Sequence, residues 1–489
     1  MSDRAATGIH GLDSILGGGL PRHRIYLVEG DPGAGKTTLA MQFLLEGVRQ
    51  GESVLYITLS ETEGEIKLIA ESHGWSLDGV SLFELSALEQ QMRLEAENTI
   101  FHPSEVELTE TTRALLRHVE SVGPKRVVFD SLSELRLLAQ NPLRYRREVL
   151  NLKQYFTRSR ATVLLLDDRT SESGDMQLQS LAHGVLSLQQ MSPEYGGDRR
   201  RLRVAKLRGL RFVGGYHDFT IRTGGLDVFP RLVASEHHAQ FAKQTLTSGI
   251  EALDAMLGGG IDRGTSTLVM GPAGTGKSAV AQQYAVAAAR RGEKVAIFAF
   301  DELRGIAIQR ADALGMNMSK HVDSGAIIVQ QIDPAEMSPG ELMQRVRDLV
   351  EKQGVSFLVI DSINGYLYSM PAERFLYIQL HELLAYLGQS GVTTMLLMAQ
   401  QGLVGTVTSP VDVSYLADTV VLLRYFEALG RVRKAAAVIK KRTGAHEDTI
   451  RELTIGGDGV KLGEPLSEFR GVLTSVPEYH GAKEHLEEQ

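Results

Sequence analysis

The chain has 489 residues, of which 43% are hydrophobic and 23% are charged, and this composition excludes disorder as the dominant state. It contains no cysteine, which excludes a disulfide framework and a thiolate metal site. The formal net charge of −8 argues against a dominant electrostatic grip on nucleic acid.

In chain order, the first predicted elements are short apolar runs that alternate with helical patterns. Strand-like runs lie at residues 25–30, 54–59, 126–130 and 162–167, and a helix with apolar positions at i, i+3 and i+4 is predicted over 37–50. The runs are rich in Val, Leu and Ile without polar alternation, which is typical of parallel strands buried on both faces. Strands that alternate with helices predict an α/β fold with a mostly parallel sheet flanked by helices.

The second half of the chain repeats the first. Five blocks recur in the same order, 231 to 241 residues apart: the opening GI-x-x-LD with its GGG, then GDPGAGKT and GPAGTGKS, YITLSE and IFAFDE, VVFDS and LVIDS, and VAKLRG and VIKKRT. This period is far longer than that of a solenoid repeat, so each copy is expected to be a domain with its own core. The smaller offset of the later blocks predicts an insertion in the first copy around Ser86 to Glu110, as a surface excursion.

The repeat sets the expected domain boundaries. A mixed stretch without a strong period lies between Pro230 and Thr247. We therefore expect a first domain over residues 1–235, a second over 236–465 and a C-terminal tail over 466–489 whose charged tip is disordered.

Two glycine-rich loops carry the strongest chemical signal. Both match G-x-x-x-x-G-K-[ST], and each follows a strand and opens a helix, which is the context that a phosphate-binding loop requires. Glycines let backbone N–H groups face an anion, and the helix N-terminus adds partial positive charge. The alternative, an incidental glycine-rich turn, is hard to reconcile with two matches at the same place of a duplicated domain. The predicted nucleotide-binding residues are Gly30, Asp31, Pro32, Gly33, Ala34, Gly35, Lys36, Thr37 and Thr38 in the first loop, and Gly271, Pro272, Ala273, Gly274, Thr275, Gly276, Lys277, Ser278 and Ala279 in the second.

The metal that accompanies a nucleoside triphosphate is expected beside these loops. The hydroxyls of Thr37 and Ser278 are predicted Mg²⁺ ligands. Asp130 and Asp361 each end an apolar strand and are predicted to hold the ion as well. A strand-terminal Asp that only caps the next helix is the alternative. ATP and Mg²⁺ are thus the expected cofactors.

Acidic residues at the end of the second strand of each copy are candidates for orienting or deprotonating water. The first copy offers Glu61, and the second offers Asp301 and Glu302. An acidic turn that is merely solvated surface is the alternative. Its recurrence at the same offset favours the catalytic interpretation.

With these blocks in place, the chain resembles the KaiC family, the ATPases and autokinases of the cyanobacterial circadian clock and their bacterial relatives, within the RecA-like P-loop group. The resemblance covers about residues 5–478 and includes the opening at Thr7–Gly19, both phosphate loops, the acidic pair, the Asp-Ser strand end and the K-x-R blocks. It implies two tandem RecA-like P-loop domains.

The family also implies a homo-oligomer, a ring of six subunits with ATP between neighbours and the K-x-R residues reaching the γ-phosphate in trans. Those residues are Lys206 and Arg208 in the first copy and Lys440 and Arg442 in the second. A cation inserted by a neighbour would neutralise charge that develops in phosphoryl transfer. A solvated basic face is the alternative.

The sequence departs from the family pattern at the acidic pair, where the family has two adjacent glutamates and the first is usually assigned as the base. Ser60 stands at that place in the first copy and Asp301 in the second. Hydrolysis in the first copy must therefore use Glu61 or be slow. The autophosphorylated Ser-Thr pair of the clock protein corresponds here to Ser414 and Tyr415, which makes Ser414 a phosphosite candidate beside the alternative of a simple loop serine.

The leading functional hypothesis is an oligomeric Mg²⁺-dependent ATPase, with serine autokinase activity as a further candidate, that acts as a regulatory or signalling switch. One alternative is a DNA-acting RecA-like ATPase, which would need basic loops to line a pore for nucleic acid. The loop at 166–180 has one Arg against three Asp and one Glu, and the loop at 398–414 has no Lys or Arg, which disfavours this alternative. Another alternative, kept open by Ser60, is a nucleotide-gated scaffold with little catalysis. No apolar run approaches the roughly 18 residues of a spanning helix, and the N-terminus lacks the apolar core of a signal peptide, so we expect a cytoplasmic protein without a membrane partner.

Overall fold

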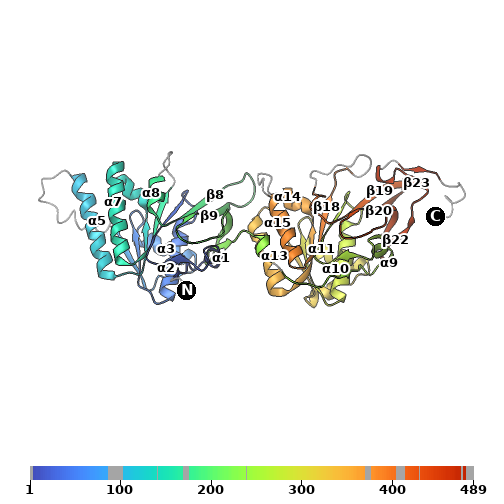
Figure 1. Cartoon of the computed structure of the whole chain (residues 1–489), viewed down its shortest axis with the longest axis horizontal. Coiled ribbons are helices and arrows are strands. Elements are labelled where there is room, and N and C mark those ends of the chain that lie inside the picture. The colour runs from blue at the N-terminus through green and yellow to red at the C-terminus, as the bar shows by residue number, and fades with distance from the viewer. Residues whose placement is uncertain are drawn as a thin grey trace. The chain divides into compact units, whose positions relative to one another are not determined.

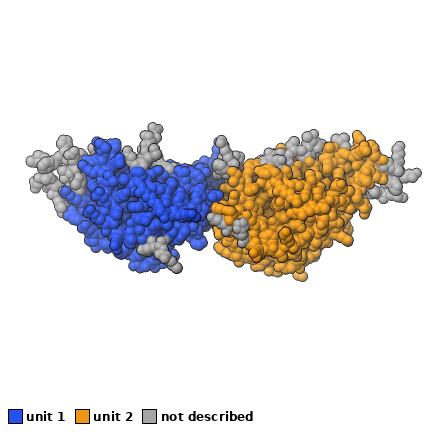
Figure 2. Space-filling view, in the orientation of Figure 1, with its two compact units in different colours: residues 1–231 blue, residues 232–489 orange. Residues whose placement is uncertain are grey.

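The computed structural model describes residues 4–85, 103–139, 141–168, 176–237, 239–368, 376–402, 413–428, 430–474 and 477–480. The chain forms two compact units, residues 1–231 and residues 232–489, which are coloured separately in Figure 2. Each unit is an α/β domain with helices on both sides of a central sheet (Figure 1). In the described part of the chain, no helix is both long and apolar enough to cross a membrane.

In unit 1 the described strands of the main sheet follow the order β11-β10-β9-β8-β3-β7-β6-β4-β5. Six neighbouring strands of this order pair in parallel, namely β5, β4, β6, β7, β3 and β8. The strands β9, β10 and β11 then extend the sheet from β8 with antiparallel pairing. The strands are β3 (Ile25–Gly30), β4 (Val54–Thr58), β5 (Val80–Glu84), β6 (Arg126–Asp130), β7 (Thr162–Asp168), β8 (Gly184–Met191), β9 (Arg199–Leu207), β10 (His217–Arg222) and β11 (Gly225–Phe229), with a small ribbon of β1 (Arg4–Ala5) and β2 (Leu20–Pro21).

The helices of unit 1 cover both faces of this sheet (Figure 1). They are α1 (His10–Ile15), α2 (Lys36–Arg49), α3 (Glu63–Ser72), α5 (Pro103–Val122), α6 (Leu132–Ala139), α7 (Pro142–Ser159) and α8 (Met176–Leu181). The central strand β3 shows why the sheet is covered twice: Tyr26 and Val28 enter one apolar core with α2, and Ile25 and Leu27 enter the other with α7. Successive side chains of a strand point to opposite faces, so an uninterrupted apolar run requires a core on each side.

Unit 2 repeats this plan, and its main sheet has the order β16-β15-β17-β18-β14-β19-β20-β21-β22. The strands are β14 (Ser266–Gly271), β15 (Lys294–Ala299), β16 (Ile327–Gln331), β17 (Val355–Asp361), β18 (Thr393–Ala399), β19 (Thr419–Ala428), β20 (Arg431–Lys441), β21 (Arg451–Gly456) and β22 (Gly459–Pro465), with small ribbons of β12 (Thr245–Leu246) with β13 (Ile261–Asp262) and of β23 (Phe469–Arg470) with β24 (Glu478–Tyr479). The helices are α9 (Glu251–Met256), α10 (Lys277–Arg290), α11 (Arg304–Ala313), α12 (Met318–Asp323), α13 (Pro339–Gln353), α14 (Ile363–Tyr368) and α15 (Leu376–Gln389), with the 3₁₀ turns η1 (Ala234–Glu236) and η2 (Val472–Thr474).

Position by position, β14 of unit 2 takes the place of β3, β17 that of β6, β18 that of β7, and β20 that of β9. The predicted fold class, tandem α/β domains with a mostly parallel sheet, is confirmed.

The predicted C-terminal tail and the predicted insertion are only partly covered by the described residues. The tail was expected from residue 466, yet Leu466, Phe469 and Val472 pack against Phe426 of β19 in a small apolar cluster. Further along, β24 pairs with β23, and Tyr479 of β24 lies opposite Phe469 of β23. The disordered tip expected at the very end lies outside the described residues, as does most of the predicted insertion, of which the structure describes the helix α5.

Candidate nucleotide sites

The first phosphate loop connects β3 to α2 at the carboxyl end of the parallel strands. Gly30 is the last residue of β3 and Lys36 is the first of α2. Gly35, the N-cap, has φ of 97°, and a Cβ there would lie 2.7 Å from Cδ1 of Ile221. Only glycine fits this backbone conformation next to the neighbouring strand. The loop therefore presents its backbone N–H groups and the helix N-terminus to the same side.

The second phosphate loop has the same geometry between β14 and α10. Its N-cap Gly276 has φ of 107°, and a Cβ would lie 2.2 Å from Cδ1 of Ile455. The lysines that follow the two N-caps are buried, with 7% exposure for Lys36 and 8% for Lys277. Each ammonium donates to two carbonyl oxygens of its own loop: Lys36 to Gly30 and Asp31, Lys277 to Gly271 and Pro272. Each ammonium therefore lies against the start of its own phosphate loop, on the loop that would hold the phosphates.

In the first site the hydroxyl of Thr37 donates to the carboxylate of Asp130 over 3.0 Å. The phenol of Tyr56 donates to the same carboxylate oxygen over 2.5 Å. Burial raises the pKa of Asp130, and the hydrogen bonds from Tyr56 and Thr37 and the charge of Lys36 oppose that rise. The predicted metal-binding pair, Thr37 and Asp130, is brought together.

The second site pairs Ser278 with Asp361 in the same way. Burial raises the pKa of Asp361, and a hydrogen bond from Ser278 opposes the rise. The peptide bonds after Asp130 and Asp361 are both cis. A hydroxyl and a carboxylate are the hard oxygen donors that Mg²⁺ prefers, and the ion normally adds substrate phosphates and water to one or two such ligands. The donor sets of both sites fit Mg²⁺, and the described residues contain no group of three or more His, Asp and Glu side chains that would hold a metal without a nucleotide.

The acidic turn of the first site contributes one half-buried carboxylate. Glu61 lies beside Asp130, and burial together with the charge of Asp130 raises the pKa of Glu61. Its Oε2 is buried and has no hydrogen-bond partner among the described residues. The hydroxyl of Thr58 holds the turn by accepting from the Glu61 N–H over 3.0 Å and donating to its carbonyl over 2.8 Å. Ser60, by contrast, is exposed.

The two carboxylates of the second acidic turn are already engaged. Asp301 accepts a hydrogen bond from the hydroxyl of Ser362 over 2.5 Å. Glu302 forms an ion pair with Arg310 of α11 over 2.6 Å. Both charges act on Asp361, whose pKa they help to raise. Like Glu61 in the first site, these carboxylates lie next to the predicted metal-binding aspartate.

The first K-x-R residues lie at the other end of the sheet. Lys206 donates to the carbonyl of Gln179 over 2.5 Å, and Arg208 donates to the carbonyl of Ser180 over 2.8 Å. The N–H of Arg208 donates to the carbonyl of His183, and the N–H of His183 donates to the carbonyl of Ile25, the first residue of β3. Arg208 therefore lies at the height of Ile25 along the strand. Because β3 rises about 3.3 Å per residue, this level is about 16 Å from Gly30, where the phosphate loop starts.

The second K-x-R block has the same position in unit 2. Lys440 donates to the carbonyls of Ser414 and Ala417, and Arg442 pairs with Asp418. Asp418 is anchored in turn to Ser266, the first residue of β14.

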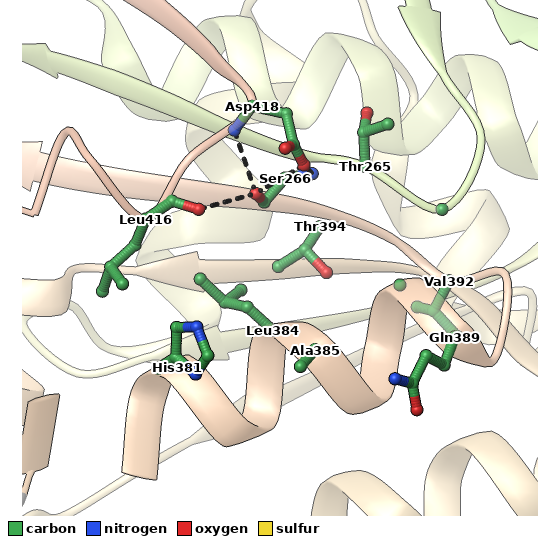
Figure 3. A pocket seen from close by; sticks show the side chains of 12 residues that line it. Thr265, Ser266, His381, Leu384, Ala385, Gln389, Val392, Thr394, Leu416 and Asp418 are labelled. Atoms are coloured by element: carbon green, nitrogen blue, oxygen red, sulfur yellow. Dashed lines mark hydrogen bonds between the residues drawn. The ribbon is translucent and has the colours of Figure 1, made fainter. Parts of the chain in front are cut away.

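Figure 3 shows this end of unit 2, where a pocket of about 330 Å³ opens between α15 and the first residues of β14 and β18. Asp418, Ser266 and Thr394 line it together with His381. The pocket is thus separate from the phosphate loop, which lies at the opposite end of the same strand.

The comparisons with known proteins agree with this duplicated geometry. The model of the family described as "ATPase: KaiC" matches residues 5–233 and again residues 246–467. The chain belongs to the KaiC ATPase family. It is therefore an ATP-hydrolysing P-loop enzyme built from two copies of the KaiC domain.

Curated relatives of the KaiC family match nearly the whole chain. A "Circadian clock oscillator protein KaiC" of Parathermosynechococcus lividus is 27% identical over 96% of this chain and 87% of its own length. From Synechocystis sp., a "Circadian clock protein KaiC3" is 25% identical over 99% of this chain and 96% of its own length, and a "Circadian clock protein KaiC2" is 28% identical over 97% and 84%.

Two polar contacts of these KaiC-type sites were not predicted from the sequence. Tyr56 lies inside an apolar strand, where nothing marks its hydroxyl as a partner of Asp130. Asp168 ends β7 and forms an ion pair of 2.6 Å with Lys36. Its position after an apolar strand was a usable signal, but the contact depends on β7 lying next to β3. The loops used against the nucleic-acid hypothesis fall partly on residues 169–175 and 403–412, outside the described residues.

Proposed function

We propose that this KaiC-family ATPase works as a Mg²⁺-dependent homo-oligomer, with a hexamer as the expected size, in which the K-x-R residues of one subunit complete the ATP sites of its neighbour and nucleotide state acts as a switch. The observation that carries the proposal is the separation within each unit between the K-x-R residues and the phosphate loop. A side chain of Lys or Arg cannot span the length of the central strand. If these cations act on a γ-phosphate, that phosphate belongs to another subunit.

The division of chemistry follows from the residues beside each loop. The phosphate-loop backbone and Lys36 or Lys277 bind and orient the phosphates. Bound Mg²⁺ would be held by Thr37 and Asp130, or by Ser278 and Asp361, and would neutralise phosphate charge.

Proton transfer from water or a hydroxyl would fall to the carboxylates of the acidic turns. Glu61 is suited to accept a proton, because its pKa is raised and one of its oxygens has no hydrogen-bond partner among the described residues. Asp301 would first have to release the hydroxyl of Ser362.

Complementation between two inactive variants tests the proposal. One variant carries Lys36→Ala with Lys277→Ala and lacks phosphate binding. The other carries Lys206→Ala with Lys440→Ala and keeps both phosphate loops. Mixed rings should regain ATPase activity at about a quarter of their interfaces, because only there does an intact loop face an intact K-x-R block.

Size measurement with and without Mg²⁺ and ATP accompanies this assay. Mixed oligomers that form without regaining activity would contradict completion in trans. A nucleotide-saturated monomer with full activity would remove the oligomer from the proposal altogether.

A second candidate function, serine autophosphorylation, is favoured by the position of Ser414. Its carbonyl accepts a hydrogen bond from Lys440 over 2.9 Å. An acceptor hydroxyl beside a residue that reaches a neighbour's γ-phosphate is well placed for transfer from that neighbour. Tyr415, although exposed, carries its hydroxyl on a long rigid ring and is a poor substitute.

Mass mapping after incubation with Mg²⁺-ATP tests this second function. Phosphate is expected on Ser414 and should disappear in Ser414→Ala and in the Asp301→Asn/Glu302→Gln double variant. Steady hydrolysis with no phosphate on the protein would leave the ATPase switch alone.

A further inference from the structure

The lysine of the first phosphate loop has a carboxylate partner. Lys36 donates to the carbonyl oxygens of Gly30 and Asp31 over 3.0 and 2.9 Å, and its ammonium lies 2.6 Å from Oδ1 of Asp168. An ammonium group has three N–H donors. All three are therefore engaged by groups of the protein itself.

Among the residues that the structure describes, the second phosphate loop has no counterpart of this third contact. Lys277 makes the same two backbone hydrogen bonds, and among the described residues the acidic side chain that acts on it is Asp361, at longer range. In the register of the sheets, Asp168 stands opposite Gly30, whereas Ala399 stands opposite Gly271. The methyl group of Ala399 cannot compete for an ammonium.

Polar contacts fix the end of β7, which carries Asp168, to the helix α6. The N–H of Asp168 donates to the hydroxyl of Ser133 on α6 over 3.0 Å, and the same hydroxyl donates to Asp167 over 3.1 Å. Arg136, also on α6, holds Asp167 in an ion pair of 3.0 Å. The side chain of Asp168 is 29% exposed, so its carboxylate can turn toward solvent while the strand end stays in place.

We propose that Asp168 is a specificity-determining residue that occupies Lys36 in place of a γ-phosphate and makes the first site favour a nucleoside diphosphate over a triphosphate. A diphosphate leaves the γ position empty, so Lys36 can keep Asp168 while it exchanges one of its two carbonyl partners for the β-phosphate. A triphosphate brings a second anion, the γ-phosphate, to the same ammonium. The carboxylate of Asp168 must then either give up Lys36 or remain beside a group of like charge that repels it. The inference rests on the proposed use of both loops as adenine-nucleotide sites.

Asp168→Asn in the whole chain tests this role, in a Lys277→Ala background that removes the second site. Trp75 is the single tryptophan of the chain and packs against the core of unit 1 that includes α2. Energy transfer from Trp75 to the N-methylanthraniloyl derivatives of ADP and AMPPNP therefore reports binding at the first site. The triphosphate analogue should bind roughly tenfold to a hundredfold more tightly in the variant, the range for removing a competing charge-assisted hydrogen bond, and ADP should gain less.

Asp227→Asn is the control for net charge, because Asp227 is an exposed residue of β11; it should bind both nucleotides like the parent. Urea unfolding followed through Trp75 checks that Asp168→Asn folds, and Asp168→Ser provides a second neutral variant. Equal affinities of the parent and both Asp168 variants for both nucleotides would overturn the inference. So would a lower turnover at unchanged affinity, which would make Asp168 a proton acceptor instead. Absence of binding in the parent as well would instead refute the first site as a nucleotide site, and with it the proposed function there.

Discussion

A buried histidine makes the stability of unit 1 depend on pH. His217, on β10, is 1% exposed. Its Nδ1 accepts the N–H of Arg231 over 2.8 Å, and its Nε2 lies 3.0 Å from the carbonyl oxygen of Val213. This arrangement uses the neutral ring with its proton on Nε2, and burial lowers the pKa of His217 from 6.5 to about 4.

The size of the effect follows from linkage. Between pH 6.5 and pH 4 the unfolded chain binds a proton at this residue and the folded chain does not, so the free energy of unfolding falls as the pH falls. A shift of this size corresponds to a loss of about 3 kcal/mol once the pH is below the folded pKa, and to about 2 kcal/mol between pH 7 and pH 5.

Urea unfolding followed by Trp75 fluorescence measures this loss in unit 1 of the whole chain. His217→Gln can keep both hydrogen bonds without titrating, so it should lose about 2 kcal/mol less than the parent between pH 7 and pH 5. The exposed His10→Gln is the matched control and should behave like the parent. Parallel pH profiles for the parent and His217→Gln would refute the assignment of a buried neutral ring.

Three further predictions concern the sites and the core. Lys277→Ala should remove more ATP turnover than Lys36→Ala, because Asp168 competes with a γ-phosphate for Lys36 in the first site; the opposite ranking in intact oligomers would make Glu61 the better base. Tyr56→Phe removes a hydrogen bond from the buried carboxylate of Asp130 and should weaken Mg²⁺-dependent nucleotide binding at the first site several-fold. An unchanged dependence of nucleotide binding on the Mg²⁺ concentration would refute this role of Tyr56. Arg126→Met leaves the carbonyls of Ala6 and Phe43 without their donor and removes one of the two arginine partners of Glu52, and it should cost about 3–5 kcal/mol of unit 1 stability. A loss of unfolding free energy in urea below a third of that would contradict it.

The duplication, the fold class and the two phosphate loops could be predicted from the sequence alone. These features are local or periodic: a glycine pattern between a strand and a helix has few other physical uses, and apolar runs without alternation require a sheet covered on both faces. Thr37 with Asp130, and Ser278 with Asp361, could also be paired from the sequence, because a phosphate loop and the end of a neighbouring parallel strand lie at the same edge of the sheet. The roles assigned to these residues remain predictions, as do the trans K-x-R residues and Ser414.

The surroundings of each of these groups, by contrast, depend on contacts between distant parts of the chain. Strand order is not written in local pattern, so the placement of β7 beside β3, which brings Asp168 to Lys36, could not be read from the chain. The same holds for Tyr56 of β4, whose hydroxyl donates to Asp130 at the end of the neighbouring strand β6, and for Asp301 and Glu302, which look alike in sequence but have different partners. Within the described part of the chain, Lys36 pairs with a carboxylate and Lys277 does not. This difference between the two sites therefore arises from long-range packing around two nearly identical loops.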